Sequence, residues 1–324
     1  MQKDKISVLM CAYNAADYIG QAIQSIIDQT YTNWELLISD DFSTDSTFQI
    51  AQAYAQKDAR IKLFKQPENL GYLLNTNFIW NKAEGQFITF QDADDWSSVD
   101  RLIKQSQFLI NNEVDICSSN FSRVDLIGKN KSIGEIEDLP SLSYNFIYQH
   151  FVAKRTLPVF AGTLFLNRKV LNSVGTYNPF FSRKCGEDTD WILRASRDFK
   201  IGTMSNILYY YRENPKGVTQ NLTVDKLINY TLILKIHENF IKTGADLLDT
   251  KNQAVLLTLE KALKKPFLLD NSKIYYEQVK NSIYHKNWKS ALKKMLRAIR
   301  AKPFHIPYYK TLFFIIRNFD TEKH

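Results

Sequence analysis

The stretch ISVLMCAYNAADYIGQAIQSIIDQTYTNWELLISDD, which runs from Ile6 to Asp41, decides the fold class. It holds two apolar runs, Ile6–Ala12 and Trp34–Ser39, separated by a segment whose apolar residues recur every three or four positions. Continuous apolar runs of this length predict strands buried on both faces, and the intervening period predicts an amphipathic helix over 17–29. Strand, helix and strand at this spacing predict a parallel sheet covered by helices.

The same alternation continues to residue 90. A helix is expected to open near Ser43 and Thr44, because their hydroxyls are suited to cap it. The later elements expected are a strand over 61–64, a helix that follows the turn 69–71 and runs to Glu84, and a strand over 87–90. The fold class predicted is therefore α/β, with a Rossmann-like, mostly parallel sheet and flanking helices.

Beyond residue 100 the signals are mixed and then helical. The segments DICSSN (115–120), AGTLFLN (161–167) and ILYYYR (207–212) predict strands. From about Leu222 the pattern is helical, with few Gly or Pro residues. We therefore predict one domain over 1–220 and a helical C-terminal region over 221–324, with the boundary near Gln220.

Acidic or polar groups follow three of the predicted strands. They are CAYN (11–14), SDDFSTD (39–45) and QDADDW (91–96). Ligands in parallel sheets bind at the carboxyl ends of the strands, and crowded carboxylates need a cation or donors to balance them. Asp92 and Asp94 suit a hard divalent cation whose remaining ligands are phosphates and water. The alternative is that these residues only form turns and caps.

The composition of the chain argues against several classes of protein. The chain has 324 residues and a net charge of +8, and residues 281–324 hold ten Lys or Arg against two Asp or Glu. The remaining residues are neutral overall, which disfavours a nucleic-acid-binding body. The three cysteines are far apart, so we expect no disulfide framework and a reducing, cytoplasmic location. With no run of about 20 apolar residues, we expect no membrane-spanning helix.

Four segments resemble family 2 glycosyltransferases. The first is the opening run over 6–47, and the last is CGEDTDWILR over 185–194. The other two lie together in ENLGYLLNTNFIWNKAEGQFITFQDADDW over 68–96. The resemblance covers roughly Lys5 to Arg212 and keeps the order and spacing of the segments. It implies the GT-A fold, a nucleotide-sugar donor, a divalent metal (Mn or Mg) and inversion at the anomeric carbon.

The resemblance also implies roles for individual residues. Cys11, Tyr13 and Asp41 match positions that hold the nucleobase, while Asp92 and Asp94 match the DXD motif of the donor and metal site. Two departures stand out. Thr76 occupies a position where the family often has Arg or Lys, so Lys65, Lys82 or Arg101 would have to compensate. The segment after residue 210 lacks a His that members often have, which leaves Arg212 or Lys216 for the diphosphate.

The run GEDTDWILR supplies the candidate catalytic base. Inverting transfer needs a carboxylate that deprotonates the acceptor hydroxyl. The resemblance implies that Asp188 is this base, with Glu187 as the second candidate. Acidic residues in a first helical turn also stabilise the helix dipole, which is the purely structural interpretation.

The basic C-terminal segment predicts an amphipathic helix. Its apolar face is formed by Trp288, Ala291, Leu292, Met295, Leu296 and Ile299, and its other face by Lys and Arg. After Pro303 come two tyrosines and the apolar run 312–316. A basic face beside an aromatic, apolar face suits an anionic membrane surface, whereas an ordinary helix packed on the body is the alternative.

These observations lead to one expected function and one rival. We expect a metal-dependent hexosyltransferase that moves a sugar from a nucleotide-diphosphate donor, a UDP-sugar rather than a dTDP- or GDP-sugar, to a glycan or lipid-linked acceptor in surface polysaccharide synthesis. It would act in the cytoplasm, peripherally on the inner face of the membrane, and bind no nucleic acid. The rival is a catalytically inactive module that binds a nucleotide sugar or a partner enzyme.

Overall fold

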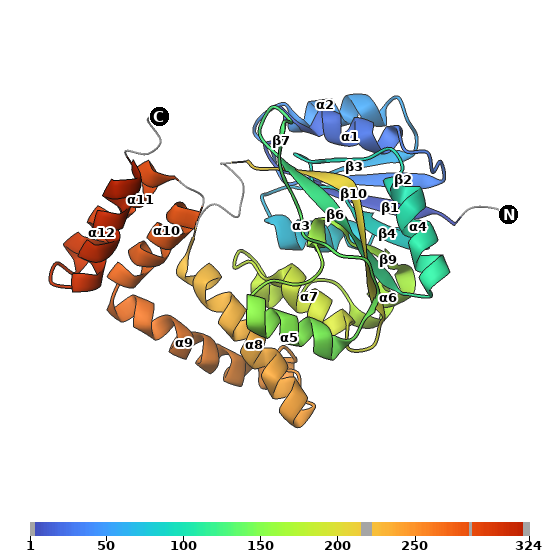
Figure 1. Ribbon diagram of the computed structural model, residues 1–324. Helices are drawn as coiled ribbons and strands as arrows, with labels where there is room; N and C mark the ends of the chain where they lie inside the picture. Colours follow the sequence, from blue (N-terminus) through green and yellow to red (C-terminus); the bar gives the residue numbers. More distant parts are fainter. Residues whose placement is uncertain (1–3, 215–221, 285–286, 320–324) are drawn as a thin grey trace. The chain divides into compact units, whose positions relative to one another are not determined.

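The computed structural model describes residues 4–214, 222–284 and 287–319. The chain divides into two compact units, Met1–Gly217 and Val218–His324 (Figure 1). The boundary predicted near Gln220, and Lys216 as a candidate phosphate ligand, lie outside the described residues. The first unit holds a mixed sheet with helices on its faces, and the second unit is helical.

The first unit contains ten strands and seven α-helices among its described residues. The strands are β1 (Ile6–Ala12), β2 (Trp34–Asp40), β3 (Ile61–Lys65), β4 (Phe87–Phe90), β5 (Trp96–Ser97), β6 (Ile116–Val124), β7 (Asn130–Ile133), β8 (Leu139–Leu142), β9 (Phe165–Asn167) and β10 (Ile201–Arg212). The helices are α1 (Ile19–Ile27), α2 (Thr47–Ala55), α3 (Tyr72–Trp80), α4 (Arg101–Asn112), α5 (Tyr144–Lys154), α6 (Arg168–Val174) and α7 (Glu187–Ala195).

The sheet has the strand order β3-β2-β1-β4-β9-β6-β10-β5. The parallel pairing expected from the sequence holds for β3, β2, β1 and β4, and also for β6 with β10. The rest departs from the mostly parallel sheet, because β9 runs antiparallel to both β4 and β6, and β5, β7 and β8 pair antiparallel at the periphery. Since β1 and β2 are parallel neighbours of one another, their carboxyl ends meet at one edge.

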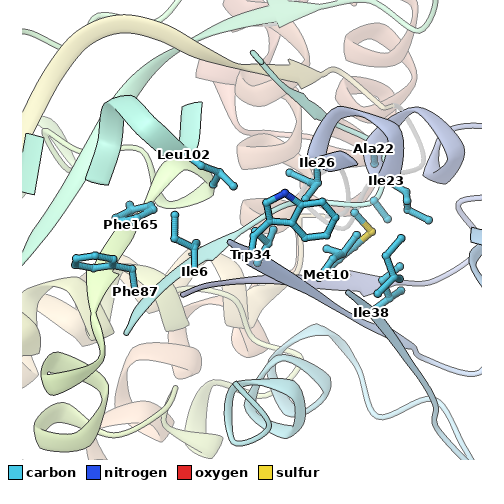
Figure 2. Packing of buried hydrophobic residues seen from close by; sticks show 14 of the residues in the cluster. Ile6, Met10, Ala22, Ile23, Ile26, Trp34, Ile38, Phe87, Leu102 and Phe165 are labelled. Carbon is cyan, nitrogen blue, oxygen red and sulfur yellow. The ribbon is translucent and has the colours of Figure 1, made fainter. Parts of the chain in front are cut away.

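The core lies where α1 and α4 cover one face of this sheet. Ile23 and Ile26 of α1 pack toward Met10 of β1 and Trp34 of β2 (Figure 2). Leu102 of α4 belongs to the same buried cluster. Burial of apolar side chains contributes roughly 25 cal/mol per Å² removed from water, so this cluster fixes the strands that carry the site.

Two predicted details are wrong, each for a local reason. Ser43 and Thr44 do not cap α2, which begins at Thr47; instead they hydrogen-bond to Asn14 and join the loops that follow β2 and β1. The helix after residue 71 ends at Trp80 and does not reach Glu84, because the Glu84 backbone N–H donates to side chains of β1 and β2.

A third difference concerns the segment AGTLFLN. Only Phe165–Asn167 forms a strand there, and Ala161–Thr163 is a 3₁₀ turn. The Thr163 hydroxyl bonds to the backbone of Ser119 in β6, so side-chain bonding replaces the strand ladder at this point.

The second unit is built from α8 (Val224–Thr243), α9 (Gln253–Leu269), α10 (Ser272–Tyr284), α11 (Trp288–Ala301) and α12 (Ile306–Phe319). Helices α10, α11 and α12 share a small core formed by Val279, Ala291, Met295, Ala298, Tyr308 and Ile315. The amphipathic helix predicted over the basic segment is confirmed as α11. Its apolar face lies in or against this core except for Leu296, which is 45% exposed because it lies beyond the reach of α10 and α12.

Candidate active site

The site lies at the edge where β1, β2 and β4 end. Cys11 is opposite Ser39 in the parallel register of β1 and β2, and Asp41 follows β2 directly. Asp92 and Asp94 follow β4, which is the other parallel neighbour of β1. The fold therefore brings the predicted nucleobase and DXD positions to one edge of the sheet.

Asp41 is buried and holds the turn that begins α3. Its two carboxylate oxygens accept hydrogen bonds from the backbone N–H groups of Leu70 (2.8 Å) and Gly71 (2.9 Å). Burial raises the pKa of Asp41, while these two hydrogen bonds and the charge of Arg183 oppose the rise. Each carboxylate oxygen has a further lone pair, so a base N–H is still a possible donor.

Cys11 and Tyr13 differ in environment. Burial raises the pKa of the Cys11 thiol to about 12, so it is neutral and acts as a small polar contact, and its sulfur lies 3.2 Å from the Thr76 hydroxyl. Tyr13 follows β1 at the same edge, and 51% of its surface is exposed. An exposed aromatic ring at this edge is available for stacking on a nucleobase.

Asp92 and Asp94 influence one another electrostatically. Burial, together with the charge of Asp94, raises the pKa of Asp92 to about 7, and Asp188 adds to the same rise. The Asp92 backbone N–H donates to the hydroxyl of Tyr209 in β10 (3.0 Å), and Asp94 accepts from the Asn214 amide (3.2 Å). The negative charge concentrated here favours a cation.

Two arginines considered as phosphate ligands serve the fold instead. Arg101 is fully buried and donates to the Phe90 carbonyl, the Ser97 hydroxyl and other groups of the sheet. Arg212 is also buried, and it donates to the carbonyl of Asp94 (2.8 Å) and the side chain of Gln21 (2.7 Å). Its position fixes the loop that carries Asp94.

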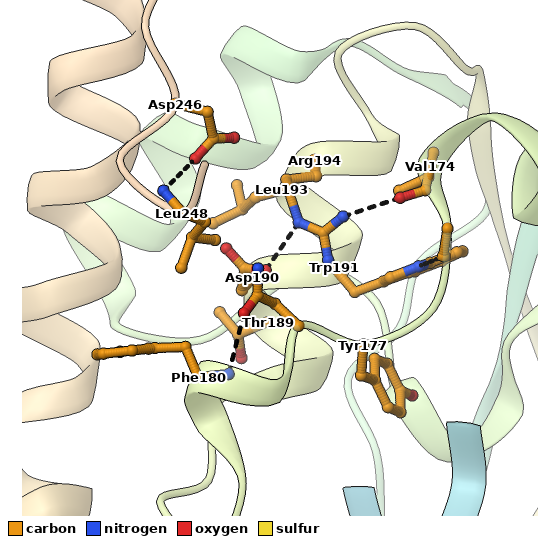
Figure 3. Close-up of polar contacts among 12 residues, drawn as sticks. Val174, Tyr177, Phe180, Thr189, Asp190, Trp191, Leu193, Arg194, Asp246 and Leu248 are labelled. Atoms are coloured by element: carbon orange, nitrogen blue, oxygen red, sulfur yellow. Dashed lines mark hydrogen bonds and ion pairs between the residues drawn. The ribbon is translucent and has the colours of Figure 1, made fainter. Parts of the chain in front are cut away.

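Helix α7 begins with three carboxylates, and they are not equivalent. Asp190 is fully buried and paired with Arg194 (2.8 Å), which also donates to the Val174 carbonyl (Figure 3). Asp188 is partly buried, and its carboxylate accepts from the backbone N–H of Thr189 (2.6 Å). Burial raises the pKa of Asp188, and its bonds to Thr189 oppose that rise. Asp190 is thus committed to the fold, which leaves Asp188 and Glu187 as candidate bases.

Tyr177 lies near the carboxylates of both α7 and the loop after β4, and it was not identified from the sequence. Its ring is held edge-on between Trp80 (5.0 Å between centroids) and Trp191 (6.5 Å). Burial raises the pKa of Tyr177 strongly, and the charges of Asp188, Glu187 and Asp92 add to the effect, so these three carboxylates lie within electrostatic reach of one hydroxyl. An aromatic residue before Asn-Pro carries no catalytic signal in sequence, because packed rings are common there.

Arg183 is a second residue that sequence reasoning missed. Its guanidinium donates to the Asn69 carbonyl (2.8 Å) beside the turn that Asp41 holds. It is exposed and lowers the pKa of Asp41, so it places a positive charge beside the end of β2.

The arrangement fits a cation that the protein holds only in part. Among residues 4–214, 222–284 and 287–319, no three His, Cys, Asp or Glu side chains gather closely enough to hold a metal ion. Magnesium and manganese sites often use one or two carboxylates and take the remaining oxygens from substrate phosphates. The mutually repelling Asp92 and Asp94 carboxylates fit that donor set.

Comparison with known proteins identifies the family. The model of glycosyl transferase family 2 matches residues 7–175. A glycosyltransferase of Haemophilus influenzae, named "Uncharacterized glycosyltransferase", is 40% identical over 40% of this chain and 51% of its own. The Escherichia coli UDP-Glc:alpha-D-GlcNAc-diphosphoundecaprenol beta-1,3-glucosyltransferase WfgD is 33% identical over 43% of this chain and 53% of its own. The chain thus spans about half the length of these relatives.

The fold agrees with that assignment. A crystal structure of S. aureus TarS 1–349 in complex with UDP-GlcNAc superposes with a TM-score of 0.60 at 18% sequence identity, covering 92% of this chain and 81% of that one. The expected GT-A fold with a helical C-terminal region is therefore confirmed. The matched residues contain β1, β2 and β4 with their acidic ends, and on this basis the chain belongs to glycosyl transferase family 2.

Proposed function

We propose that this chain is an inverting glycosyltransferase that moves a sugar from a UDP-sugar to a hydroxyl of a glycan or lipid-linked acceptor. The product would be a cell-surface polysaccharide such as a capsule, O-antigen or exopolysaccharide. One observation carries the proposal: the segment that leads into Asp188 is bonded beside the donor-site loops, because Arg183 donates to the Asn69 carbonyl next to the turn that Asp41 holds. The charges of Asp94 and Asp188 accordingly both raise the pKa of Asp92. Donor-site and base candidates thus share one edge of the sheet.

The relatives support the donor and acceptor classes. The name of WfgD specifies a UDP-glucose donor and an acceptor linked to diphosphoundecaprenol. The TarS structure contains UDP-GlcNAc. Cys11, Tyr13 and Asp41 are the residues proposed to hold the uracil base, and Arg183 is proposed to contact the diphosphate because Arg101 and Arg212 are bonded within the fold.

Asp94, assisted by Asp92, is proposed to hold a divalent Mn or Mg ion with the donor diphosphate. When bound, the ion would neutralise negative charge that develops on the leaving nucleoside diphosphate. The residues fit this role because two adjacent carboxylates supply hard oxygen ligands and leave room for phosphate oxygens.

Asp188 is proposed to take the proton from the acceptor hydroxyl. The acceptor oxygen would then bond to the anomeric carbon as the bond from that carbon to the diphosphate oxygen breaks, on the opposite face of the sugar. The raised pKa of Asp188 makes its carboxylate a stronger base than an ordinary aspartate. The hydroxyl of Tyr177 is proposed to hydrogen-bond a substrate oxygen, because the charges of Asp188 and Asp92 both act on it.

A thermal-shift screen of nucleotide sugars tests the donor proposal. A ligand present at 100 times its Kd stabilises the folded state by about 2.7 kcal/mol. With Mn, UDP-sugars are expected to raise Tm more than dTDP- or GDP-sugars, and EDTA is expected to remove most of the effect. If no nucleotide sugar raises Tm, the donor proposal is wrong. Donor binding without transfer to any hydroxyl acceptor would instead favour an inactive binding module.

The proposed location is the cytoplasm, at the inner face of the membrane. A donor that is a nucleotide sugar and an acceptor that is lipid-linked would meet there. The proposal therefore predicts that acceptors which carry a lipid diphosphate are used more efficiently than the free oligosaccharide, and a comparison of the two kcat/KM values tests it.

A further inference from the structure

Helix α12 has two apolar faces, and the second unit buries only one of them. Tyr308 and Ile315 are buried against α10 and α11, and the Tyr308 hydroxyl bonds to that of Ser272 (2.9 Å). On the opposite side, apolar residues spaced three and four apart are exposed: Ile306 (69%), Tyr309 (47%), Phe313 (70%) and Ile316 (49%). That spacing places them on one stripe of the helix.

The exposed stripe continues into the turn that precedes it. Phe304 lies between α11 and α12 and is 95% exposed. Phe314, at the margin of the stripe, is about half exposed. Scattered single apolar residues on a surface need no explanation, whereas a contiguous aromatic and aliphatic stripe marks a contact surface.

The charges around this stripe have one sign. Residues 288–319 contain eight Lys or Arg and no Asp or Glu. Lys310 and Arg317 are exposed on the same side of α12 as Phe313. On α11, Lys289, Lys293 and Arg297 are exposed, while its apolar face is occupied by packing on α10. Apart from Leu296, the exposed surface of α11 is therefore cationic.

We propose that the outward stripe of α12, with Phe304, lies in the surface layer of an anionic lipid membrane. The helix would lie along the surface, with Ile306, Phe313 and Ile316 among the lipid chains. Lys310 and Arg317 would extend their charged ends to the headgroups. The basic face of α11 would add attraction to the same anionic surface. This inference does not depend on the donor or acceptor proposed above.

The charges decide between a lipid surface and an apolar protein partner. Protein interfaces are depleted of charged residues, Lys above all, at their buried centres. On the surface of α12, Lys310 and Arg317 lie between Phe313 and Phe314, and a headgroup layer accommodates such alternation of cations and apolar groups. Of the described helices, none is long and apolar enough to cross a bilayer.

Co-sedimentation of the full chain with vesicles tests the proposal. Phosphatidylcholine vesicles with about 30% phosphatidylglycerol are expected to bind the chain, and vesicles without the anionic lipid much less. Each Lys or Arg lost from an anionic surface lowers affinity about fivefold, so the double variant Lys310→Glu, Arg317→Glu is expected to bind at least about 30-fold more weakly. Raising salt from about 0.1 M to 1 M shortens the Debye length from about 10 Å to 3 Å and is expected to weaken binding.

Two matched controls separate the stripe from general effects. Lys261→Glu with Lys273→Glu makes the same change in net charge at exposed positions of α9 and α10, and is expected to bind within about threefold of wild type. For the apolar part, Phe313→Ser with Ile316→Ser is expected to weaken binding, whereas Val255→Ser with Leu257→Ser on α9 is not.

Three results would overturn the proposal. The first is that wild type does not sediment with anionic vesicles at low salt, or that the charge control weakens binding as much as the α12 variant. The second is that Phe313→Ser, Ile316→Ser lowers Tm by several degrees, because the stripe would then pack within the chain. The third is a wild-type dimer, seen by sedimentation velocity, that the same variant converts to a monomer.

Discussion

The acidic residues of this site differ in the hydrogen bonds and ion pairs that they already form. Asp190 is paired with Arg194, and Asp41 is occupied by two backbone N–H groups. Within the part of the chain that the structure describes, the Asp188 carboxylate accepts from Thr189 in the next position, so it has capacity left for a substrate hydroxyl. Asp94 bonds to one amide from Asn214. Asp94 and Asp188 are therefore the carboxylates assigned to metal and acceptor, while Asp41 keeps one lone pair on each oxygen for a base N–H.

Sequence reasoning located these carboxylates but did not rank them. The run EDTD offers three acidic residues in one helical turn, and nothing in the letters shows which of them is buried. The position of Arg194, four residues after Asp190, indicates which carboxylate is paired, since oppositely charged residues at that spacing pair on a helix. Tyr177 and Arg183 had no such signal, because their places follow from tertiary packing.

Asp94→Asn is expected to abolish transfer while the chain still folds, because this carboxylate lies on a loop at the edge of the sheet and not in the core. Donor binding by the variant should no longer respond to EDTA. The matched control is Asp198→Asn, an exposed carboxylate after α7, which should leave activity unchanged. Calorimetric titration of a UDP-sugar with and without Mn measures both effects. Near-normal activity in the Asp94 variant would contradict the assignment.

Among the elements, β1 to β3 are joined by one buried carboxylate at the edge opposite the site. Glu35 of β2 accepts from Ser7 of β1 (2.6 Å) and pairs with Lys5 and Lys62 (2.9 Å each). The Glu84 N–H also donates to it. This explains why the helix predicted to reach Glu84 ends four residues earlier. Hydrophobic period alone cannot foresee such an end, because it records apolar residues and not polar partners.

Glu35→Gln is therefore expected to destabilise the fold in a pH-dependent way. Burial alone would raise the pKa of Glu35, but the hydrogen bonds from Ser7, Lys5 and Lys62 lower it to about 2, against 4.5 for a free glutamate. The folded-state pKa is depressed, so its contribution, on the order of 3 kcal/mol, is present above pH 4.5 and is lost as pH falls toward 2. Urea unfolding at pH 7 and pH 3 should show a difference from wild type that is clearly larger at pH 7 than at pH 3. Equal differences at both values would contradict the account.

The two structural units of the molecule also differ in net charge. Met1–Gly217 holds 23 Lys or Arg and 25 Asp or Glu, whereas Val218–His324 holds 19 and 9. The parallel pairing of β3, β2, β1 and β4 was predictable from the strand and helix pattern of the first 90 residues, whereas their order comes from the structure. The antiparallel direction of β9 could not be predicted, because a three-residue strand preceded by a 3₁₀ turn has too little periodicity to reveal its direction.

This division predicts where the chain tolerates truncation. A chain that ends at Gly217 is expected to unfold cooperatively and to bind the donor, because it keeps the sheet and the site. A chain that ends at Lys280 is expected to aggregate, since removing α11 and α12 uncovers Val279 and Tyr276 of α10. Circular dichroism melts and light scattering compare the two. A soluble, cooperatively folded chain ending at Lys280 would show that α10 does not need its partners.

The kcat of Asp188→Asn, measured beside Glu187→Gln, tests the central claim most directly. A general base contributes about 10² to 10⁴ in rate, so kcat of Asp188→Asn should fall by that factor. Its Kd for the donor should stay within about twofold of wild type, because the base acts on the acceptor and not on the nucleotide. Glu187→Gln should keep most of its activity. An undiminished kcat in Asp188→Asn, or a loss confined to Glu187→Gln, would contradict the account.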